Sequence, residues 1–229
     1  MVKMVHAISS EIVKGYGLSA GASVVGIAAS KDFGLAPEGF KPTDVLHECL
    51  SVIVLGATFP RVVLNDVALY TASRNEMLTK MTNMAKDVAK QIKRDGYKAR
   101  EVSGAGGKWV DGDGRKEHFG HISLKHAAEL AGLGVIGKNY LLTNSKYGNL
   151  LLFSAVLTDA DLTPDKKVQY AICDNCNKCV EMCPSKALDD PVSFGKKKCD
   201  GTMFKMVNGK WLLECFLCRK VCPNCFGKY

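Results

Sequence analysis

The first 172 residues of this 229-residue chain contain a single cysteine, Cys49, whereas the other nine lie between Cys173 and Cys225. A secreted scaffold held by disulfides would spread its cysteines over the whole domain. Cysteines gathered in one segment instead indicate metal ligands in a reducing compartment. Cys49 lies in the apolar stretch 45–55, and we expect it to be an ordinary buried thiol.

Long apolar runs are also missing from the sequence. No run reaches the roughly 18 residues that span a bilayer, and residues 1–10 lack the apolar core of a secretory signal. We therefore expect a cytoplasmic protein without membrane association. The length allows one medium domain with a core of its own and a small appended module.

Basic residues outnumber acidic residues, and the formal net charge is +8. Residues 164–229 hold 12 Lys/Arg and 7 Asp/Glu. Such an excess can indicate nucleic acid as a partner. Thiolates that bind metal would bring the charge of the loaded protein nearer to about +4, because a metal and its ligands dominate the local charge. Lys196, Lys197 and Lys198 then offset thiolate charge, and we expect no nucleic-acid partner.

Strands and helices alternate in residues 1–163, which indicates an α/β layer structure. Met77, Met81, Met84, Val88 and Ile92 follow a helical period and predict a long helix with one buried face, ended by a glycine cap at position 96. The segment 104–120, rich in glycine and charge, predicts a long functional loop. The remaining predicted elements are buried strands over 22–29, 49–57, 97–103 and 147–157 and short helices over 10–17 and 123–131.

The cysteines follow the pattern of bacterial ferredoxins. The run C-x2-C-x2-C-x3-C-P supplies three ligands to one cluster and its fourth cysteine to another. A partial second copy, Cys215-x2-Cys218-x3-Cys222-Pro223, lacks a leading cysteine. Cys199 can replace it, because Asn208-Gly209 is a strong signal for a type I′ hairpin that returns the chain to its start.

We therefore predict two 4Fe-4S clusters in a ferredoxin-like domain spanning 164–229. One cluster is assigned to Cys173, Cys176, Cys179 and Cys222, and the other to Cys183, Cys199, Cys215 and Cys218. Cys225 is left over, and it is an alternative to Cys222. Pro223 matches Pro184 and favours Cys222. Two zinc sites would need separate paired CxxC motifs rather than this interlocked run.

At this point the chain resembles a known family. Residues 122–139 (ISLKHAAELAGLGVIGKN), Tyr147-Gly148-Asn149, the strand 52–60 and the cysteine pattern are similar to the epoxyqueuosine reductase and reductive dehalogenase group. The resemblance implies a nitroreductase-like α+β N-terminal domain carrying a cobalamin, with FMN as the alternative, that a cluster reduces. It assigns five residues to this cofactor: Gly132, Gly134, Gly137, Lys138 and Asn139. A helix cap and turn is the alternative role for the glycines, and a solvated surface position is the alternative for Lys138.

The chain also departs from the family pattern. Members are longer, with a helical-repeat region that helps hold tRNA, so we expect a short form. The acid that they place before the AGLG helix is not evident here. His118 and His121 occupy that neighbourhood, and we assign them as proton donors, although loop histidines are often simply solvated.

We expect an oxidoreductase that takes electrons from a low-potential donor, such as a ferredoxin or flavodoxin, and reduces a small-molecule substrate or cofactor. A ferredoxin-type electron carrier without a substrate and a corrinoid-reactivating partner protein are the alternatives.

Overall fold

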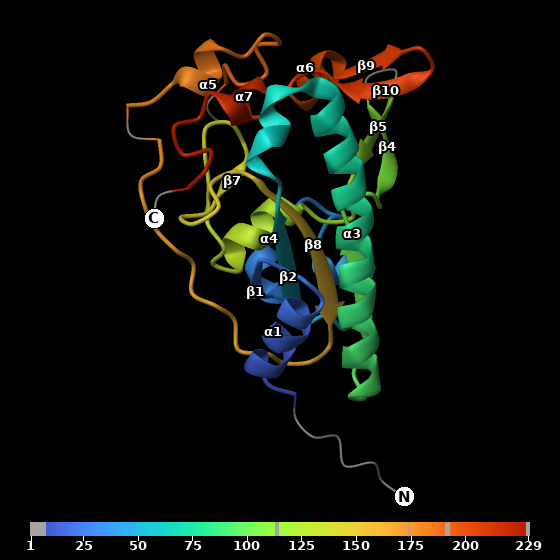
Figure 1. Cartoon of the computed structure of the whole chain (residues 1–229). Coiled ribbons are helices and arrows are strands. Elements are labelled where there is room, and N and C mark those ends of the chain that lie inside the picture. The colour runs from blue at the N-terminus through green and yellow to red at the C-terminus, as the bar shows by residue number, and fades with distance from the viewer. Residues whose placement is uncertain (1–7, 113–114, 174, 191–192, 228–229) are drawn as a thin grey trace, which may run out of the picture. The chain divides into compact units, whose positions relative to one another are not determined.

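The computed structural model describes residues 8–112, 115–173, 175–190 and 193–227 (Figure 1). The chain folds into two compact units, each discontinuous in sequence. The sheet unit takes the described residues of 1–57, 78–133 and 152–168, and the cysteine unit takes those of 58–77, 134–151 and 169–229. The predicted boundary between 1–163 and 164–229 stays a prediction, but the two units do not follow a single cut.

The sheet unit is built on strands β1 (Val24–Ala29), β2 (Ser51–Thr58), β3 (Ala99–Ser103) and β8 (Leu151–Thr158). Their order in the sheet is β1-β2-β8-β3, and the β1–β2 and β3–β8 pairs are antiparallel. Side chains of β2 and β8 are buried almost without interruption. All four predicted strands are therefore confirmed. They form because β-branched apolar runs fit a sheet that is covered on both faces.

Helix α3 (Val67–Arg94) confirms the predicted apolar stripe. Met81, Met84, Val88 and Ile92 are at most 2% exposed. The helix ends in a Schellman cap: Gly96 N–H donates to Lys93 O and Tyr97 N–H to Ile92 O, while Gly96 adopts a φ of 98°. The stripe is core packing, since its members lie in the interior.

Helices α1 (Ser10–Ser19) and α4 (Leu124–Leu130) both pack on β1. Ser9 caps α1, and its hydroxyl accepts a hydrogen bond from Ile12 N–H at 3.3 Å. The two predicted short helices are thereby confirmed.

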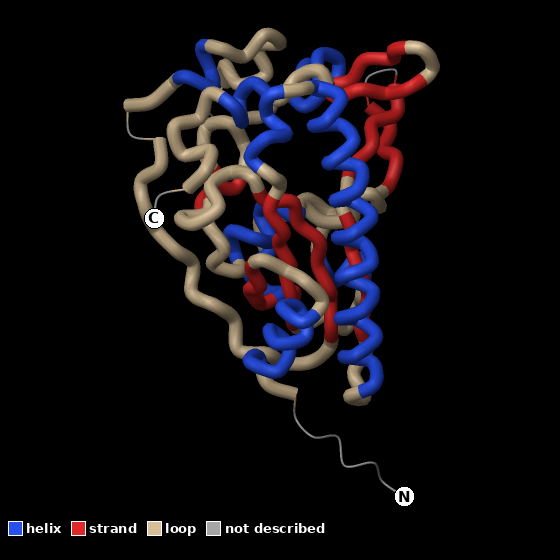
Figure 2. Tube along the Cα trace, viewed as in Figure 1, coloured by secondary structure: helices blue, strands red, loops and turns tan. Residues whose placement is uncertain are grey.

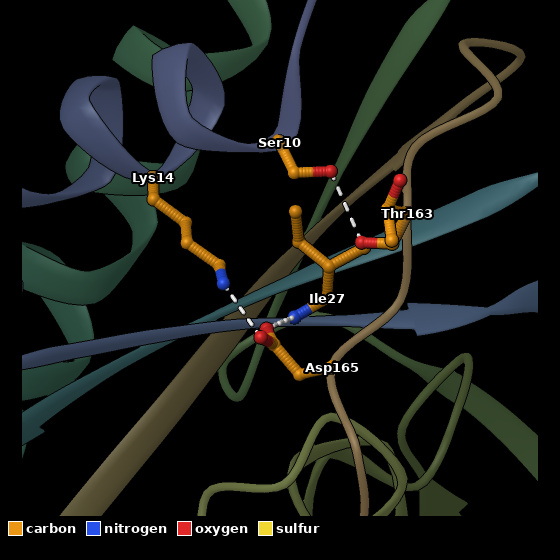
Figure 3. Close-up of polar contacts among 5 residues, drawn as sticks. All are labelled: Ser10, Lys14, Ile27, Thr163 and Asp165. Carbon is orange, nitrogen blue, oxygen red and sulfur yellow. Dashed lines mark hydrogen bonds and ion pairs between the residues drawn. The ribbon is translucent and has the colours of Figure 1, made fainter.

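The segment after β8 is fastened to β1 (Figure 3). Asp165 N–H donates to Ile27 O at 2.8 Å, and the Asp165 carboxylate accepts from Ile27 N–H at 2.9 Å and from the Lys14 ammonium at 2.6 Å. Ser10 Oγ donates to Thr163 O at 3.0 Å. The segment after β8 is thus a strap that satisfies backbone groups of the edge strand β1.

The prediction of a long loop over 104–120 is wrong. Strands β4 (Lys108–Gly112) and β5 (Arg115–Phe119) form an antiparallel hairpin there. Cross-strand pairs stabilise it, because Trp109 lies opposite His118 with ring centroids 5.2 Å apart. Gly112 is itself paired, opposite Arg115, while Gly106, Gly107 and Gly120 lie outside the paired residues. Composition alone does not reveal this arrangement.

The cysteine unit contains short elements joined by loops (Figure 2). Phe59, Tyr70 and Phe216 stack with centroid separations of 5.7 and 4.2 Å, and Leu213 N–H donates to Thr71 Oγ1 at 3.0 Å. These contacts explain why residues 58–77 join the C-terminal segment. The elements of the unit's later part are β6 (Val135–Ile136), β7 (Leu142–Thr143), α5 (Lys178–Glu181), α6 (Lys196–Met203), β9 (Phe204–Val207), β10 (Lys210–Leu213) and α7 (Leu217–Lys220).

Shorter helical turns complete the description. They are η1 (Ser30–Phe33), α2 (Pro42–Val45) and η2 (Arg61–Asn65). In the part of the chain that the structure describes, no helix combines the length and the apolar character that crossing a membrane requires.

Candidate metal centre

Cysteines from both runs line one cavity in the cysteine unit. Cys173 and Cys176 come from the loop that leads into α5, Cys179 lies within α5, and Cys222 follows α7. The complete lining is Gly137, Asn139, Thr143, Ile172, Cys173, Cys176, Cys179, Cys222, Pro223 and Asn224. The four cysteines are the set that the sequence assigned to the first cluster.

Hydrogen bonds hold the two cysteine runs side by side. Asn224 Nδ2 donates to Ile172 O at 2.7 Å, just before Cys173. Asn149 N–H donates to Cys225 O at 3.1 Å, and its amide Nδ2 donates to Arg219 O at 3.4 Å. Side chains remote in sequence therefore place Cys222 beside the first run.

The thiols of this first set influence one another electrostatically. Burial raises the pKa of Cys179, and negative charge at Cys173 and Cys222 raises it further. Burial likewise raises the pKa of Cys222, and charge at Cys173 and Cys176 adds to the effect. Burial and neighbouring negative charge therefore both favour the protonated forms of Cys179 and Cys222, and a bound cation would oppose this effect.

The second predicted set also gathers. Cys179 and Cys183 lie in a buried cluster with Ala187 and Leu188, and Cys199 and Cys218 pack against it. Burial raises the pKa of Cys218 to about 12, and charge at Cys199 and Cys215 contributes in the same direction. Packing therefore joins Cys183, Cys199 and Cys218, and Cys215 is near enough for its charge to affect the pKa of Cys218.

Cys183 behaves differently from the other buried thiols. Burial acts to raise its pKa, but hydrogen bonds from the Ser185 side chain and from backbone groups of Ser185, Ala187 and Leu188 outweigh this effect. The pKa of Cys183 is therefore lowered. The turn after Cys183 is preorganised to stabilise a thiolate before metal arrives.

The hairpin between Cys199 and Cys215 is confirmed. Strand β9 pairs with β10, and Asn208 and Gly209 adopt positive φ angles of 49° and 75°, as a type I′ turn requires. Glu214 N–H donates to Met203 O at 2.8 Å and closes the hairpin base. Cys199 lies within α6, immediately before the hairpin, so the loop returns the chain to it.

Cys225 is 1% exposed, and burial raises its pKa to about 11. Its carbonyl carbon and oxygen pack against Gly148, where an added Cβ would lie 2.1 Å from Cys225 O. These contacts favour a packing role for Cys225, whereas Cys222 lines the cavity.

Two of the glycines assigned to a cofactor serve the chain's own packing. Gly132, at φ 70°, ends α4 in a Schellman cap, with its N–H donating to Glu129 O and Leu133 N–H to Ala128 O. A Cβ at Gly132 would lie 2.4 Å from Lys166 O, and one at Gly134 would lie 2.4 Å from Thr143 O. The cap alternative describes Gly132, whereas the missing side chain at Gly134 makes room for the backbone of β7.

Gly137, Lys138 and Asn139 contact the cysteine runs. A Cβ at Gly137 would lie 3.3 Å from Cys173 Sγ. Lys138 N–H donates to Cys173 Sγ at 3.5 Å, and Asn139 Nδ2 donates to Cys218 O at 3.3 Å. This short segment therefore touches both runs.

His118 lies on β5 against Trp109, and His121 lies just before α4, with both side chains half-buried. Both belong to the sheet unit. Their catalytic role stays a prediction.

Sequence reasoning missed the amide side chains of Asn149 and Asn224 and the buried Arg219. Asn149 stands in the Tyr147-Gly148-Asn149 motif, which could have indicated it. Nothing in the pattern around Arg219 distinguishes it from an exposed basic residue.

Among the described residues, no group of three or more His, Cys, Asp or Glu side chains is arranged to hold a single metal ion. In a 4Fe-4S cluster each thiolate binds a different iron, so the ligands surround a cube and do not converge on one ion.

No protein-family model matches the chain. An epoxyqueuosine reductase of Prochlorococcus marinus is 34% identical over 110 residues, which cover 42% of this chain and 34% of that protein. The Bacillus subtilis enzyme is 29% identical over 48% of this chain and 31% of its own length. The chain is similar to the epoxyqueuosine reductases. It spans about a third of the length of these curated relatives.

Solved structures share the fold. The epoxyqueuosine reductase of Streptococcus thermophilus matches 95% of this chain and 67% of its own, with a TM-score of 0.67 and 16% identity. A reductive dehalogenase, described as suggesting a mechanism for B12-dependent dehalogenation, matches 77% of this chain and 25% of its own, with a TM-score of 0.61 and 20% identity. These matches confirm the resemblance and a mixed α/β fold.

A third structure shows an epoxyqueuosine reductase with an epoxyqueuosine-modified tRNA stem loop. It matches 94% of this chain and 65% of its own, with a TM-score of 0.59 and 18% identity. This finding counts against our expectation that the protein has no nucleic-acid partner. That expectation came from net charge, which carries no information about the shape of a substrate.

Proposed function

We propose that this chain is an iron–sulfur oxidoreductase of the epoxyqueuosine reductase type, with two 4Fe-4S clusters bound in its cysteine unit. The observation that carries the proposal is the convergence of Cys173, Cys176, Cys179 and Cys222 on one cavity. Four thiols drawn from two interlocked runs form the donor set of such a cluster. Cys183, Cys199, Cys215 and Cys218 are proposed for the second cluster.

A buried arginine supports this reading of the site. Arg219 is 7% exposed, and its Nη1 has no hydrogen-bond partner in the described structure. A buried charge without compensation is strongly destabilising. Its charge favours the thiolate forms of Cys218 and Cys225, and its guanidinium carbon lies 5.6 Å from the centre of the Phe59 ring. An oxidised cluster with four thiolates carries a net charge of about −2 and would compensate the guanidinium.

The chain's own residues then have distinct tasks. The clusters supply one-electron transfer. The backbone groups after Cys183 and the Arg219 guanidinium stabilise thiolates. Asn224 joins the two cysteine runs, and Asn139 and Asn149 each donate to a backbone carbonyl of the second run. We propose that a low-potential donor, such as a ferredoxin or flavodoxin, delivers the electrons.

A second cofactor, cobalamin or FMN, is proposed from the resemblance. The residues first assigned to it do not support this choice equally. The missing side chains of Gly132 and Gly134 leave room for backbone oxygens of the chain itself. Gly137, Lys138 and Asn139 face the cysteine runs, so they serve the clusters.

For the substrate, we propose an epoxyqueuosine-containing nucleic acid or a smaller molecule with the same reducible group. The tRNA stem loop bound to a relative with the same fold supports the former. His118 and His121 stay the proposed proton donors.

Anaerobic purification and analysis of the full chain test the proposal. We expect about eight irons and eight sulfides per chain, with the electron paramagnetic resonance signals of reduced 4Fe-4S clusters. Titration with cobalamin and with FMN, each followed by its own absorption, then identifies the second cofactor. Incubation with a reductant and epoxyqueuosine-modified tRNA stem loop tests the activity.

Protein that binds zinc and no iron would overturn the metal assignment. Protein with both clusters but no affinity for cobalamin or FMN and no activity would be an electron carrier. A binding of cobalamin without turnover would favour the corrinoid-reactivating role.

A further inference from the structure

Lys138 lies at the tip of a tight loop between β6 and β7. Gly137 N–H donates to Leu141 O at 3.0 Å, and Tyr140 N–H donates to Gly137 O at 2.8 Å. Tyr140 adopts a positive φ of 54°, which closes the turn. The backbone at Lys138 is therefore held in place by its own loop.

Three hydrogen bonds join Lys138 to the first cysteine run. Its N–H donates to Cys173 Sγ at 3.5 Å. Its ammonium donates to Asn177 Oδ1 at 2.7 Å and to Cys176 O at 3.2 Å. An exposed lysine is usually solvated and free to rotate, whereas here two acceptors of one loop fix the charge beside proposed cluster ligands.

The absence of a side chain at Gly137 permits this approach. A Cβ there would lie 3.3 Å from Cys173 Sγ and 3.2 Å from the Ile172 side chain. Any larger residue would compete for the space that the Cys173 sulfur occupies. The glycine and the lysine therefore act as one feature, which brings a donor and a positive charge to the same thiolate.

We propose that Lys138 is a positioning residue that raises the reduction potential of the cluster held by Cys173, Cys176, Cys179 and Cys222. This inference rests on the proposed function. Hydrogen bonds to the sulfurs and local net charge are among the factors that set the potentials of such clusters. Reduction adds one electron and one negative charge, so a fixed ammonium stabilises the reduced form more than the oxidised form.

The redox step is simple to balance. The cluster gains one electron, and a reduced ferredoxin-type or flavodoxin-type donor loses one. No covalent bond forms or breaks, and Lys138 keeps its proton in both states. The effect of Lys138 on the potential is therefore electrostatic, and it is measurable without any substrate.

Redox titration of the iron-loaded full chain, followed by electron paramagnetic resonance, tests this. The variants are Lys138→Met and Lys138→Gln, which remove the charge, and Lys138→Arg, which keeps it. Lys178→Met is the matched control, because Lys178 is an exposed lysine of the same cysteine run. At a fixed solution potential, we expect Lys138→Met and Lys138→Gln to lower the reduced-to-oxidised ratio of one cluster at least threefold. This change corresponds to a fall in that cluster's reduction potential of about 28 mV for a one-electron couple.

The other cluster should keep its potential in every variant, and Arg and the Lys178 control should resemble the wild type. Unchanged potentials in both charge-removing variants would overturn the inference, and so would an equal shift in the Lys178 control. If neither neutral variant loads the first cluster, Lys138 is needed for assembly, and the inference is wrong. A wild type without iron would instead defeat the proposed function itself.

Discussion

The sheet unit and the cysteine unit are stabilised in different ways. The largest fully buried side chains are Ile27, Ile53, Leu55, Met81, Met84, Ile92, Leu157, Val13, Val52, Val54, Val63 and Val88, and all except Val63 belong to the sheet unit. The cysteine unit instead relies on an aromatic stack and on amide side chains that bind backbone carbonyls, and it gathers thiols whose ionisation burial opposes. The sheet unit carries a large apolar core. The cysteine unit has only a small buried cluster, and we propose that bound clusters complete it.

Removing iron should produce the largest difference in stability between the two units. We expect amides of the described residues in 134–151 and 169–227 to lose hydrogen-exchange protection, while β1, β2 and β3 keep theirs. Metal binding contributes folding free energy where a small core does not suffice. Hydrogen exchange with mass spectrometry on loaded and chelator-treated protein measures the effect. Equal loss of protection in both units would show that they depend on iron alike.

The next largest effect concerns the individual cysteines. Cys199→Ser should lose about half of the bound iron, because Cys199 is the isolated ligand of the proposed second cluster. Cys225→Ser is the control and should keep both clusters, since Cys225 is 1% exposed and does not line the cavity that Cys222 lines. Iron and sulfide analysis decides between them. The ligand assignment fails if Cys225→Ser is the variant that loses a cluster.

Ile92→Ala tests the apolar core of the sheet unit. Ile92 is fully buried on the inner face of α3, and its truncation should lower the free energy of unfolding of this unit by about 3 kcal/mol. Ile12→Ala is the matched control, because Ile12 is 47% exposed on α1. Native-state hydrogen exchange measures the change. Cluster absorption should not respond, and a parallel loss of iron would contradict the independence of the two units.

The smallest effect is expected for the strap. Asp165→Asn removes the charge that pairs with Lys14, and it should cost the sheet unit about 1 kcal/mol, because the pair is only partly buried. Glu48→Gln removes the charge of a more exposed pair with Lys98 and should change nothing measurable. Chemical denaturation of loaded protein compares the two. Indistinguishable variants would mean that the strap holds through its backbone alone.

Much of the fold was predictable because it depends on local patterns. The helical spacing of the methionine stripe, the buried strands and the Asn208-Gly209 turn each carry their signal within a few residues, and each is confirmed. The β4–β5 hairpin was missed because its glycine and charge content resembles a loop, while cross-strand contacts such as Trp109 with His118 stabilise it.

The glycines of the AGLG segment show a different limit. Sequence indicates that a side chain is absent at Gly132, Gly134 and Gly137, but it does not show what fills the space. Backbone oxygens occupy the space beside Gly132 and Gly134. The space beside Gly137 is bordered by side-chain atoms of Asn139, Ile172 and Cys173. The resemblance assigned these positions to a cofactor, and that role stays a prediction. The tertiary neighbours show which atoms of the chain itself lie where each side chain is missing.

The sequence by itself determined the cysteine spacing, the alternation of strands and helices and the likeness to epoxyqueuosine reductases, since these depend on the order of residues along the chain. Tertiary structure alone decided that Asn149, Thr71 and Lys138 serve the cysteine unit, that Arg219 is buried, and that the segment after β8 is bound to β1. Such contacts join residues from about 35 to more than 140 positions apart. Their formation depends on how whole elements pack, and local propensity carries no information about it.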